Sequence, residues 1–515
     1  MRIRYTVLLP PLLPLLACAI WGIKDPEGLV TTMRGWSDWV MLHFDWLFNG
    51  STFACLLIVV AAYISPLGRV KIGGDTATPL LSRPRWFAIT VCTTIATGIL
   101  FWGTAEPIYH VSGPPEAGLA EPDVFAMSIM YLHWTFTPYG MYTLGGLLFA
   151  LAFYNRRQPF AISSLLEPLL GERIHKKAGA AVDVICLFAL VAGMAGSLGA
   201  GTLSLSGGLA SERTPLVLGL IIAAIVIAFS VSAASGLQRG IRLLSGINVV
   251  GFMLLAVFVF FTGPTLEALA LSFSAAGEYV STFVPRNLGL DPGIDAAWGR
   301  AWTSFYWAGW YAWAPVTALF LGRLGRGYTV RAFIRVNLLY TSLFGAFWMV
   351  CFAAIGLVTD ESGQLSAALT EGGPEAVIYV LLDTLPLAEL TPGLFLLLVF
   401  LSYVTAADSN ISAMSALCVE GITPERQEAP LFVKLLWGGI IGTTAWVMVA
   451  FAGIDGIRLV NTLGGFPAMF LFLLAGGSLL VLVVRSWRAR PLVQGRGKGS
   501  VEVLRSESGK GAKRL

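Results

Sequence analysis

The feature that most constrains this chain is a series of long apolar segments separated by short polar loops. A helix that crosses a membrane needs about 20 consecutive apolar residues. Twelve segments meet this need and predict twelve transmembrane helices: 4–23, 46–65, 86–104, 124–154, 181–206, 215–235, 243–263, 298–322, 334–358, 385–418, 431–453 and 463–484. A soluble domain carries about 25% charged residues, whereas this chain carries 12% and has a mean hydropathy of +0.74. We therefore predict an all-α polytopic membrane protein.

The positions of the basic residues predict how the helices are oriented. If both termini are cytoplasmic, 28 of the 34 Lys and Arg residues lie on the cytoplasmic side. This bias agrees with the positive-inside rule, and one missed helix would invert every later loop. We predict a multi-pass inner (plasma) membrane protein with both termini in the cytoplasm. The basic residues 485–515 are expected to form a cytoplasmic tail that touches anionic membrane lipid.

The chain lacks the residues that several classes of protein function need. The six cysteines form no CxxC pair, and no two of the four histidines have metal-ligand spacing, so we expect no disulfide and no metal site. No phosphate-binding glycine loop and no long soluble segment occur. We therefore expect neither an enzyme nor an ATP-driven pump, and no nucleic-acid partner. We interpret His133 as a hydrogen-bonded packing residue, with a proton relay as the alternative.

Aromatic residues crowd two of the predicted spans. Trp134, Tyr139 and Tyr142 lie in the fourth span, and Trp307, Trp310 and Trp313 recur every third residue in the eighth. At 1.5 Å per residue the three tryptophans climb about 9 Å, deeper than an interfacial aromatic belt requires. Aromatic faces attract cations that carry no proton to donate. We predict a cage for a quaternary ammonium group rather than a belt.

Two further spans interrupt the apolar pattern. In the third, Thr93, Thr94, Thr97 and Gly98 predict a weakened helix whose freed backbone groups could bind a ligand, or else tight helix packing through small residues. In the tenth, Asp408 is a carboxylate inside an apolar segment. Such residues are costly in a membrane and therefore functional candidates, although a structural cap on a broken helix is the alternative.

These segments together resemble the betaine/choline/carnitine transporter family over roughly residues 5–485. The resemblance rests on Phe-Trp-Gly-Thr-Ala-Glu-Pro at 101–107, His-Trp at 133–134, the aromatic run at 305–315, the glycine-rich run at 193–201 and Ala-Asp-Ser at 407–409. It implies a LeuT-like fold, with two helices in residues 1–65 followed by inverted five-helix repeats in residues 86–263 and 298–484. Residues 264–297 would connect the repeats as a surface or amphipathic segment. The resemblance also implies homotrimers and alternating access, without a cofactor other than a coupling ion such as Na⁺.

The resemblance also assigns roles to residues of this chain. It places Trp134, Tyr139, Tyr142 and Trp310 in the cage, Trp307 and Trp313 on the permeation path, and Thr94, Ala96 and Thr97 near the substrate carboxylate. Ile95, Thr405 and Asp408 fall at positions linked to ion coupling.

This chain departs from the family pattern at several of those positions. The family's betaine carriers commonly have Trp where Tyr139 and Gly309 stand, so the cage here is one ring smaller. Leu190, Met194 and Ala406 stand where sodium sites have hydroxyl groups. One sodium ion, proton coupling and sodium-independent exchange therefore all remain open.

We accordingly expect a secondary active transporter of a small quaternary-ammonium or related onium zwitterion, of the glycine betaine, choline or carnitine type. A carrier of a sulfonium or another amine zwitterion, working by sodium-independent exchange, is one alternative. A membrane channel or facilitator is another.

Overall fold

The structure is a computed structural model that describes residues 2–94, 96–115, 121–171, 174, 178–209, 212–234, 238–422 and 429–488. For a few of these residues only the backbone is described: 92, 93, 96, 97, 233, 234, 238–245 and 409.

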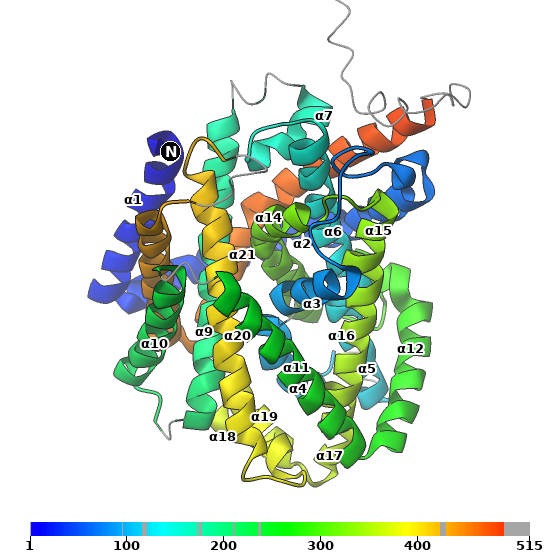
Figure 1. Ribbon diagram of the computed structural model, residues 1–515. Coiled ribbons are helices and arrows are strands. Elements are labelled where there is room, and N and C mark those ends of the chain that lie inside the picture. Colours follow the sequence, from blue (N-terminus) through cyan, green and yellow to red (C-terminus); the bar gives the residue numbers. More distant parts are fainter. Residues whose placement is uncertain are drawn as a thin grey trace, which may run out of the picture.

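The described chain is almost entirely helical (Figure 1). Its helices are α1 (Tyr5–Lys24), α2 (Pro26–Ile64), α3 (Arg83–Thr94), α4 (Ala96–Ser112), α5 (Pro122–Trp134), α6 (Phe136–Ala150), α7 (Glu167–Leu170), α9 (Gly179–Leu209), α10 (Pro215–Ala234), α11 (Gln238–Thr262), α12 (Thr265–Leu288), α13 (Ala296–Gly299), α14 (Phe305–Leu324), α15 (Val330–Ile334), α16 (Thr341–Met349), α17 (Ile355–Thr359), α18 (Gln364–Gly372), α19 (Pro374–Asp383), α20 (Thr391–Leu417) and α21 (Leu431–Arg488). Short 3₁₀ or π turns join them at η1 (Pro66–Arg69), η2 (Leu151–Asn155), η3 (Ile162–Leu166), η4 (Arg300–Ser304), η5 (Arg335–Tyr340), η6 (Val350–Ala354) and η7 (Asp360–Ser362).

The helices confirm the predicted all-α membrane class but not the number of spans. By length and composition, eight described helices could each cross a membrane, or nine if the bent pair α11 and α12 forms one span. The predicted third span is divided between α3 and α4, and the last two predicted spans form two helices of α21 that meet at the non-helical residue Gly453. The aromatic residues of α14 also lower its mean hydropathy. The count of twelve is therefore not confirmed by these helices.

The fourth predicted span is broken at Thr135, between α5 and α6, and the sequence explains the break. Thr135 has φ −123° and ψ −122°, which is not helical. Proline has no N–H group, and its ring collides with the carbonyl four residues earlier. Pro138 therefore cannot continue a helix through the carbonyl of Trp134. The break places the Trp134 side chain at the end of α5, where it can point between helices.

The predicted surface connection 264–297 contains α12. This helix is bent by 103° from α11 at Gly263 and Pro264. One face of α12 packs against α5, whereas Leu266, Phe273 and Val280 are each more than 70% exposed. An apolar stripe of this kind requires lipid or protein beside it.

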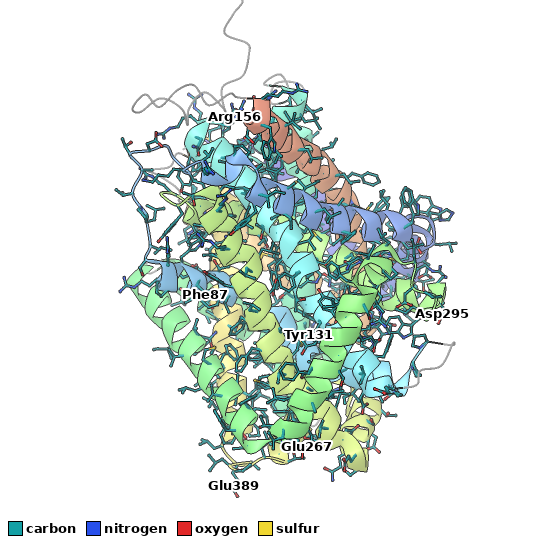
Figure 2. All side chains as sticks on the ribbon, turned by 90° about the vertical axis from the view of Figure 1, so that its right-hand side faces the viewer. Phe87, Tyr131, Arg156, Glu267, Asp295 and Glu389 are labelled. Atoms are coloured by element: carbon teal, nitrogen blue, oxygen red, sulfur yellow. The ribbon has the colours of Figure 1, made fainter. Side chains whose placement is uncertain are left out.

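The two ends of the molecule agree with the predicted sidedness. Figure 1 shows the N-terminus and the last described turns of α21 at the same end. Figure 2 shows Arg156 at one end of the molecule and Glu267 and Glu389 at the other. Which end faces the cytoplasm stays a prediction from the loop charges.

Candidate substrate-binding site

A cavity of about 90 Å³ lies between the helices, in the region where the third and fourth predicted spans are broken. Since one water occupies about 30 Å³ in the liquid, the cavity has room for a small organic group. Its walls come from α3, α4, α5, α6, α9, α14 and α21. The lining residues are Thr94, Gly98, Trp102, Trp134, Tyr142, Gly196, Ser197, Ala200, Phe305, Tyr306, Gly309, Trp310, Trp313, Ile457 and Asn461.

Three of the predicted cage residues form a continuous aromatic wall. The ring centroid of Trp310 lies 4.9 Å from that of Tyr142 and 5.6 Å from that of Trp134, and both pairs meet edge to face. All three side chains are more than 90% buried and line the cavity. Ring faces of this kind attract a cation that lies within about 6 Å of the centroid. The wall can therefore hold an onium group without any acidic side chain in contact with it.

One predicted cage residue, Tyr139, and one residue predicted on the permeation path, Trp307, lie behind this wall rather than on it. Tyr139 is fully buried, with its ring centroid 5.4 Å from that of Trp310, and it does not line the cavity. Trp307 is also fully buried and meets His133 edge to face at 5.8 Å. Trp313 lines the cavity and also a second, smaller cavity beside α20.

The remaining predicted site residues are spread over α3, α4 and α20. Thr94 lines the cavity, and its hydroxyl donates to the carbonyl of Thr90 at 2.8 Å. Ile95 lies outside the described residues, as do the side chains of Ala96 and Thr97. Thr405 donates to the carbonyl of Ser402 at 3.0 Å, and Asp408 is half-buried on α20. Neither Thr405 nor Asp408 lines the cavity.

Asn461 is a lining residue that sequence reasoning missed. Its Oδ1 is buried without a hydrogen-bond partner among the described residues, so this oxygen can accept a hydrogen bond. A Cβ atom built on Gly309 would lie 3.7 Å from Asn461 Nδ2. The glycine thus leaves open the space in which the amide lies, at the position where the family commonly has a tryptophan. The available signal was indirect: Gly309 lacks a ring within the aromatic run at 305–315 and so leaves space for another group.

Glu106 is a second missed residue, and it organises the far side of the aromatic wall. Its carboxylate is fully buried. Oε2 accepts hydrogen bonds from Trp134 Nε1 at 2.7 Å and from the hydroxyl of Tyr306 at 2.5 Å. Oε1 lies 2.6 Å from His133 Nδ1 and 3.2 Å from His110 Nε2. Glu106 stands in the Phe-Trp-Gly-Thr-Ala-Glu-Pro run, where a carboxylate inside an apolar segment was the signal.

The fold brings His110 and His133 together with Glu106, although no two histidines have metal-ligand spacing in the sequence. The potential ligand atoms of this group all lie within 4.8 Å of one another. The 2.6 Å contact of His133 is nevertheless a hydrogen-bond distance. Two ligands bound at about 2.0–2.1 Å to a tetrahedral metal lie about 3.3 Å apart. The group is therefore a hydrogen-bonded cluster in this structure, and we do not assign a metal to it.

Comparison with known proteins identifies the family. The profile of the betaine/carnitine/choline transporter family matches residues 6–488. The chain belongs to this family. Members of the family are transporters and not enzymes.

The curated relatives cover most of the chain. A probable glycine betaine transporter of Desulfitobacterium hafniense is 28% identical over 90% of this chain and 94% of its own length. A betaine/ectoine transporter of Corynebacterium glutamicum is 30% identical over 90% of this chain and 75% of its own length. A glycine betaine transporter of Bacillus subtilis is 29% identical, over 90% and 91% respectively.

Among solved structures, a Na⁺-coupled sialic acid symporter is similar to 89% of this chain and 95% of its own, at 14% identity and a TM-score of 0.45. This similarity is too low to indicate which coupling ion the protein uses.

The second cavity, of about 20 Å³, lies where the family resemblance places sodium ligands. Its walls include Met194, Ala406 and Ala407, and the oxygen-bearing side chains among its lining residues are Ser197 and Tyr403. Sodium is a hard cation that needs several oxygen ligands. The apolar lining agrees with the loss of hydroxyl groups seen in the sequence.

A third cavity, of about 510 Å³, lies beside the predicted outer loops and shares Phe305 with the substrate cavity. Its charged lining residues are Arg34, Asp38, Arg300, Asp455 and Arg458. The guanidinium carbon of Arg458 lies 5.1 Å from the centre of the Phe305 ring. Phe305 thus lies between the two cavities, and Arg458 packs against its ring from the outer one.

Proposed function

We propose that the protein is a secondary active transporter of a small onium zwitterion such as glycine betaine, working by alternating access in the inner membrane. The observation that carries the proposal is the aromatic wall of Trp134, Tyr142 and Trp310 around the buried cavity. Each ring could contribute about 0.5–2 kcal/mol to binding a cation. The names of the relatives, which are transporters of betaine and ectoine, support the same substrate class.

The zwitterion would be held at both ends. The onium group would contact the aromatic wall, and the carboxylate would accept a hydrogen bond from the amide of Asn461. These groups come from α5, α6, α14 and α21, so binding would draw separate helices together. A ligand that binds one arrangement of helices better than another shifts the population toward it, which is what alternating access requires.

The coupling ion is a separate part of the proposal. The apolar lining of the second cavity favours transport that does not use two sodium ions. A sulfonium zwitterion taken by sodium-independent exchange fits the same cage. A channel fits less well, because the buried cavity is walled by large aromatic side chains on α5, α6 and α14.

The assembly and the orientation are further parts of the proposal, supported by the exposed surface and the loop charges. The apolar stripe of α12 (Leu266, Phe273 and Val280) would face lipid or a neighbouring copy of the chain. We propose a homotrimer whose protomers each have both termini in the cytoplasm.

The test is a binding titration of the purified protein with glycine betaine, choline, carnitine, dimethylsulfoniopropionate and ectoine, with and without sodium. At least one compound should bind saturably, and Trp310→Ala should weaken that binding at least tenfold. Trp36→Ala is the matched control, because Trp36 is 59% exposed on α2, away from the cavity. Failure of every compound to bind would reject the substrate class, and equal effects of the two variants would reject the cage.

A further inference from the structure

The Glu106 cluster contains one group that can accept or release a proton without losing a hydrogen bond. His133 Nδ1 lies against Glu106 Oε1, and His133 Nε2 lies 3.1 Å from the hydroxyl of Thr303. Because an ionised carboxylate only accepts hydrogen bonds, the proton of neutral His133 is on Nδ1. A threonine hydroxyl can both donate and accept. It can donate to neutral His133 and accept from the Nε2–H of the cation.

His110 does not have this property. Its Nε2 faces Glu106 Oε1, whereas its Nδ1 is buried without a partner among the described residues. A second proton on His110 would leave an N–H group buried and unsatisfied, which is costly. The proton site of the cluster is therefore His133.

Side chains that contact the Glu106 cluster also line the cavity in which the substrate would bind. Trp134 and Tyr306 both donate to Glu106 Oε2, and both line the cavity. With neutral histidines the cluster carries the single negative charge of Glu106, and with cationic His133 it carries none. A buried charge is costly unless an opposite charge lies nearby. Either the proton on His133 or the onium group in the cage can supply that opposite charge.

Of the charges around the cluster, the competition concerns only the two that come and go, the proton and the onium group. Arg458 of α21 is a fixed cation whose charge acts on His110 and Tyr306, and it is the same whether the proton or the substrate is bound. Its guanidinium carbon lies 4.8 Å from the centre of the Trp302 ring, and Trp302 in turn contacts His110. Arg286 of α12 is paired with Glu278 and Asp291, and Glu375 of α19 with Arg213. Tyr306 of α14 stacks on His133, and Arg300 of η4 faces Asp45. The remaining titratable side chains on α4, on α5 and on the elements packed against them are Tyr109, Asp123, Tyr131, Tyr139, Tyr142, Asp183, Cys186, Glu267, Tyr279, Cys351, Glu371, Tyr379, Asp383, Tyr403 and Asp408, and, on α3, Arg83 and Arg85.

We infer that Glu106 and His133 form a proton-binding site and that the onium group of the substrate and the proton compete for its negative charge. When the substrate enters, the Nε2–H bond of His133 breaks, the proton passes to water, and the hydroxyl of Thr303 turns to donate to Nε2. In the reverse step the proton returns as the substrate leaves. The carrier would therefore exchange substrate for a proton. This inference rests on the proposed function, since it needs an onium group in the cage.

The first experiment measures protons directly. The purified wild-type protein, in weakly buffered sodium-free solution, is mixed with glycine betaine, and separately with tetramethylammonium as the bare onium group. Binding should acidify the solution, by up to one proton per bound molecule. Apparent affinity should fall as the pH is lowered from about 8.5 to 5.5, by up to about tenfold per pH unit.

Three variants locate the proton. His133→Gln should bind with an affinity that does not depend on pH and should release no proton, because the amide keeps hydrogen-bonding groups but takes no charge. Thr303→Val should keep binding but release less than the wild-type number of protons, because the cation of His133 loses its acceptor. His43→Gln is the matched control and should behave as wild type, since His43 lies on the exposed part of α2.

The outcomes separate this inference from the proposed function. If wild-type binding is saturable but releases no proton and does not depend on pH, the proton site is wrong and the onium carrier stands. Uptake of a proton on binding would also overturn it, because the sign is opposite. If His133→Gln cannot bind, the wild-type proton count and Thr303→Val still decide the matter. If no onium compound binds wild type at any pH, the proposed function itself falls.

Discussion

Asn461 brings hydrogen-bonding capacity into a cavity that is otherwise walled mainly by rings and small side chains. Its amide lies beside Gly309 and opposite the glycine-rich part of α9, where a Cβ atom on Gly196 would come within 2.5 Å of Oδ1. The crowding on that side restricts the amide to the side that faces the cavity. With the proposed function, this residue would distinguish the carboxylate end of a zwitterion from a simple cation.

The substitution Asn461→Asp should separate substrates by charge. Glycine betaine should bind about 10–100-fold more weakly, because a hydrogen bond to a charged group, worth about 1.5–3 kcal/mol, is replaced by repulsion between two carboxylates. Choline, which has the same onium group but no carboxylate, should bind at least as well as before. The two affinities are measured on the same preparation. An equal loss for both compounds would show that Asn461 only supports the cavity wall.

Sequence could predict the kinds of residue at this site better than their exact positions. A spacing of three residues turns a helix by about 300° per step, so Trp307, Trp310 and Trp313 cannot all point the same way. Only packing decides that Trp310 faces the cavity and that Trp307 faces His133. Glu106 and its two histidines could not be grouped from sequence, because 23 positions and a loop separate His110 from His133.

At the scale of elements, α21 carries two predicted spans through a bend at Gly453. This residue has φ +53° and ψ −132°, which side chains rarely allow. Gly453 divides α21 into two helices, and residues 454–462, which sequence predicted as a loop, belong to the second of them. Asn461 was missed for this reason, since it stands in that predicted loop and the second helix brings it to the cavity. Apolar length alone cannot show whether a polar interval between two spans is a loop or a bend.

Replacing Gly453 tests the bend without adding a collision. No atom lies within 4 Å of a Cβ built on Gly453, or of one built on Gly439 in the same helix. Gly453→Ala should therefore destabilise the protein by backbone strain alone, by about 1–3 kcal/mol. Gly439→Ala, at an ordinary helical position, should leave stability unchanged or raise it by up to about 1 kcal/mol. Thermal unfolding of the detergent-solubilised protein measures both, and equal midpoints for the two variants would contradict the account.

At the scale of the whole molecule, segments from distant parts of the sequence meet at the end that carries the N-terminus. Arg4 donates to the carbonyl of Leu417 and forms an ion pair with Asp183, both at 2.8 Å. Asp183 also accepts the backbone N–H groups of Ile162 and Ser163. The start of α1, the turn η3, helix α9 and the end of α20 are thereby joined through one carboxylate. The sequence had given Asp183 no role, because nothing in a single chain shows that residues 4 and 183 are neighbours.

Asp183→Asn should therefore loosen this whole end of the molecule. The carboxylate is fully buried and has three hydrogen-bonding partners, so its loss leaves Arg4 half-buried without an opposite charge, at a cost of about 2–4 kcal/mol. Asp455→Asn is the matched comparison. It removes one partner of the Arg34–Asp455 pair, whose side chains are 54% and 53% exposed, and pairs of that kind contribute less than about 1 kcal/mol. The thermal midpoint should fall clearly for the first variant and hardly for the second. Similar small shifts for both variants would mean that apolar packing between the helices stabilises this end. The ion pair of Arg4 and Asp183 would then contribute little to the stability of the protein.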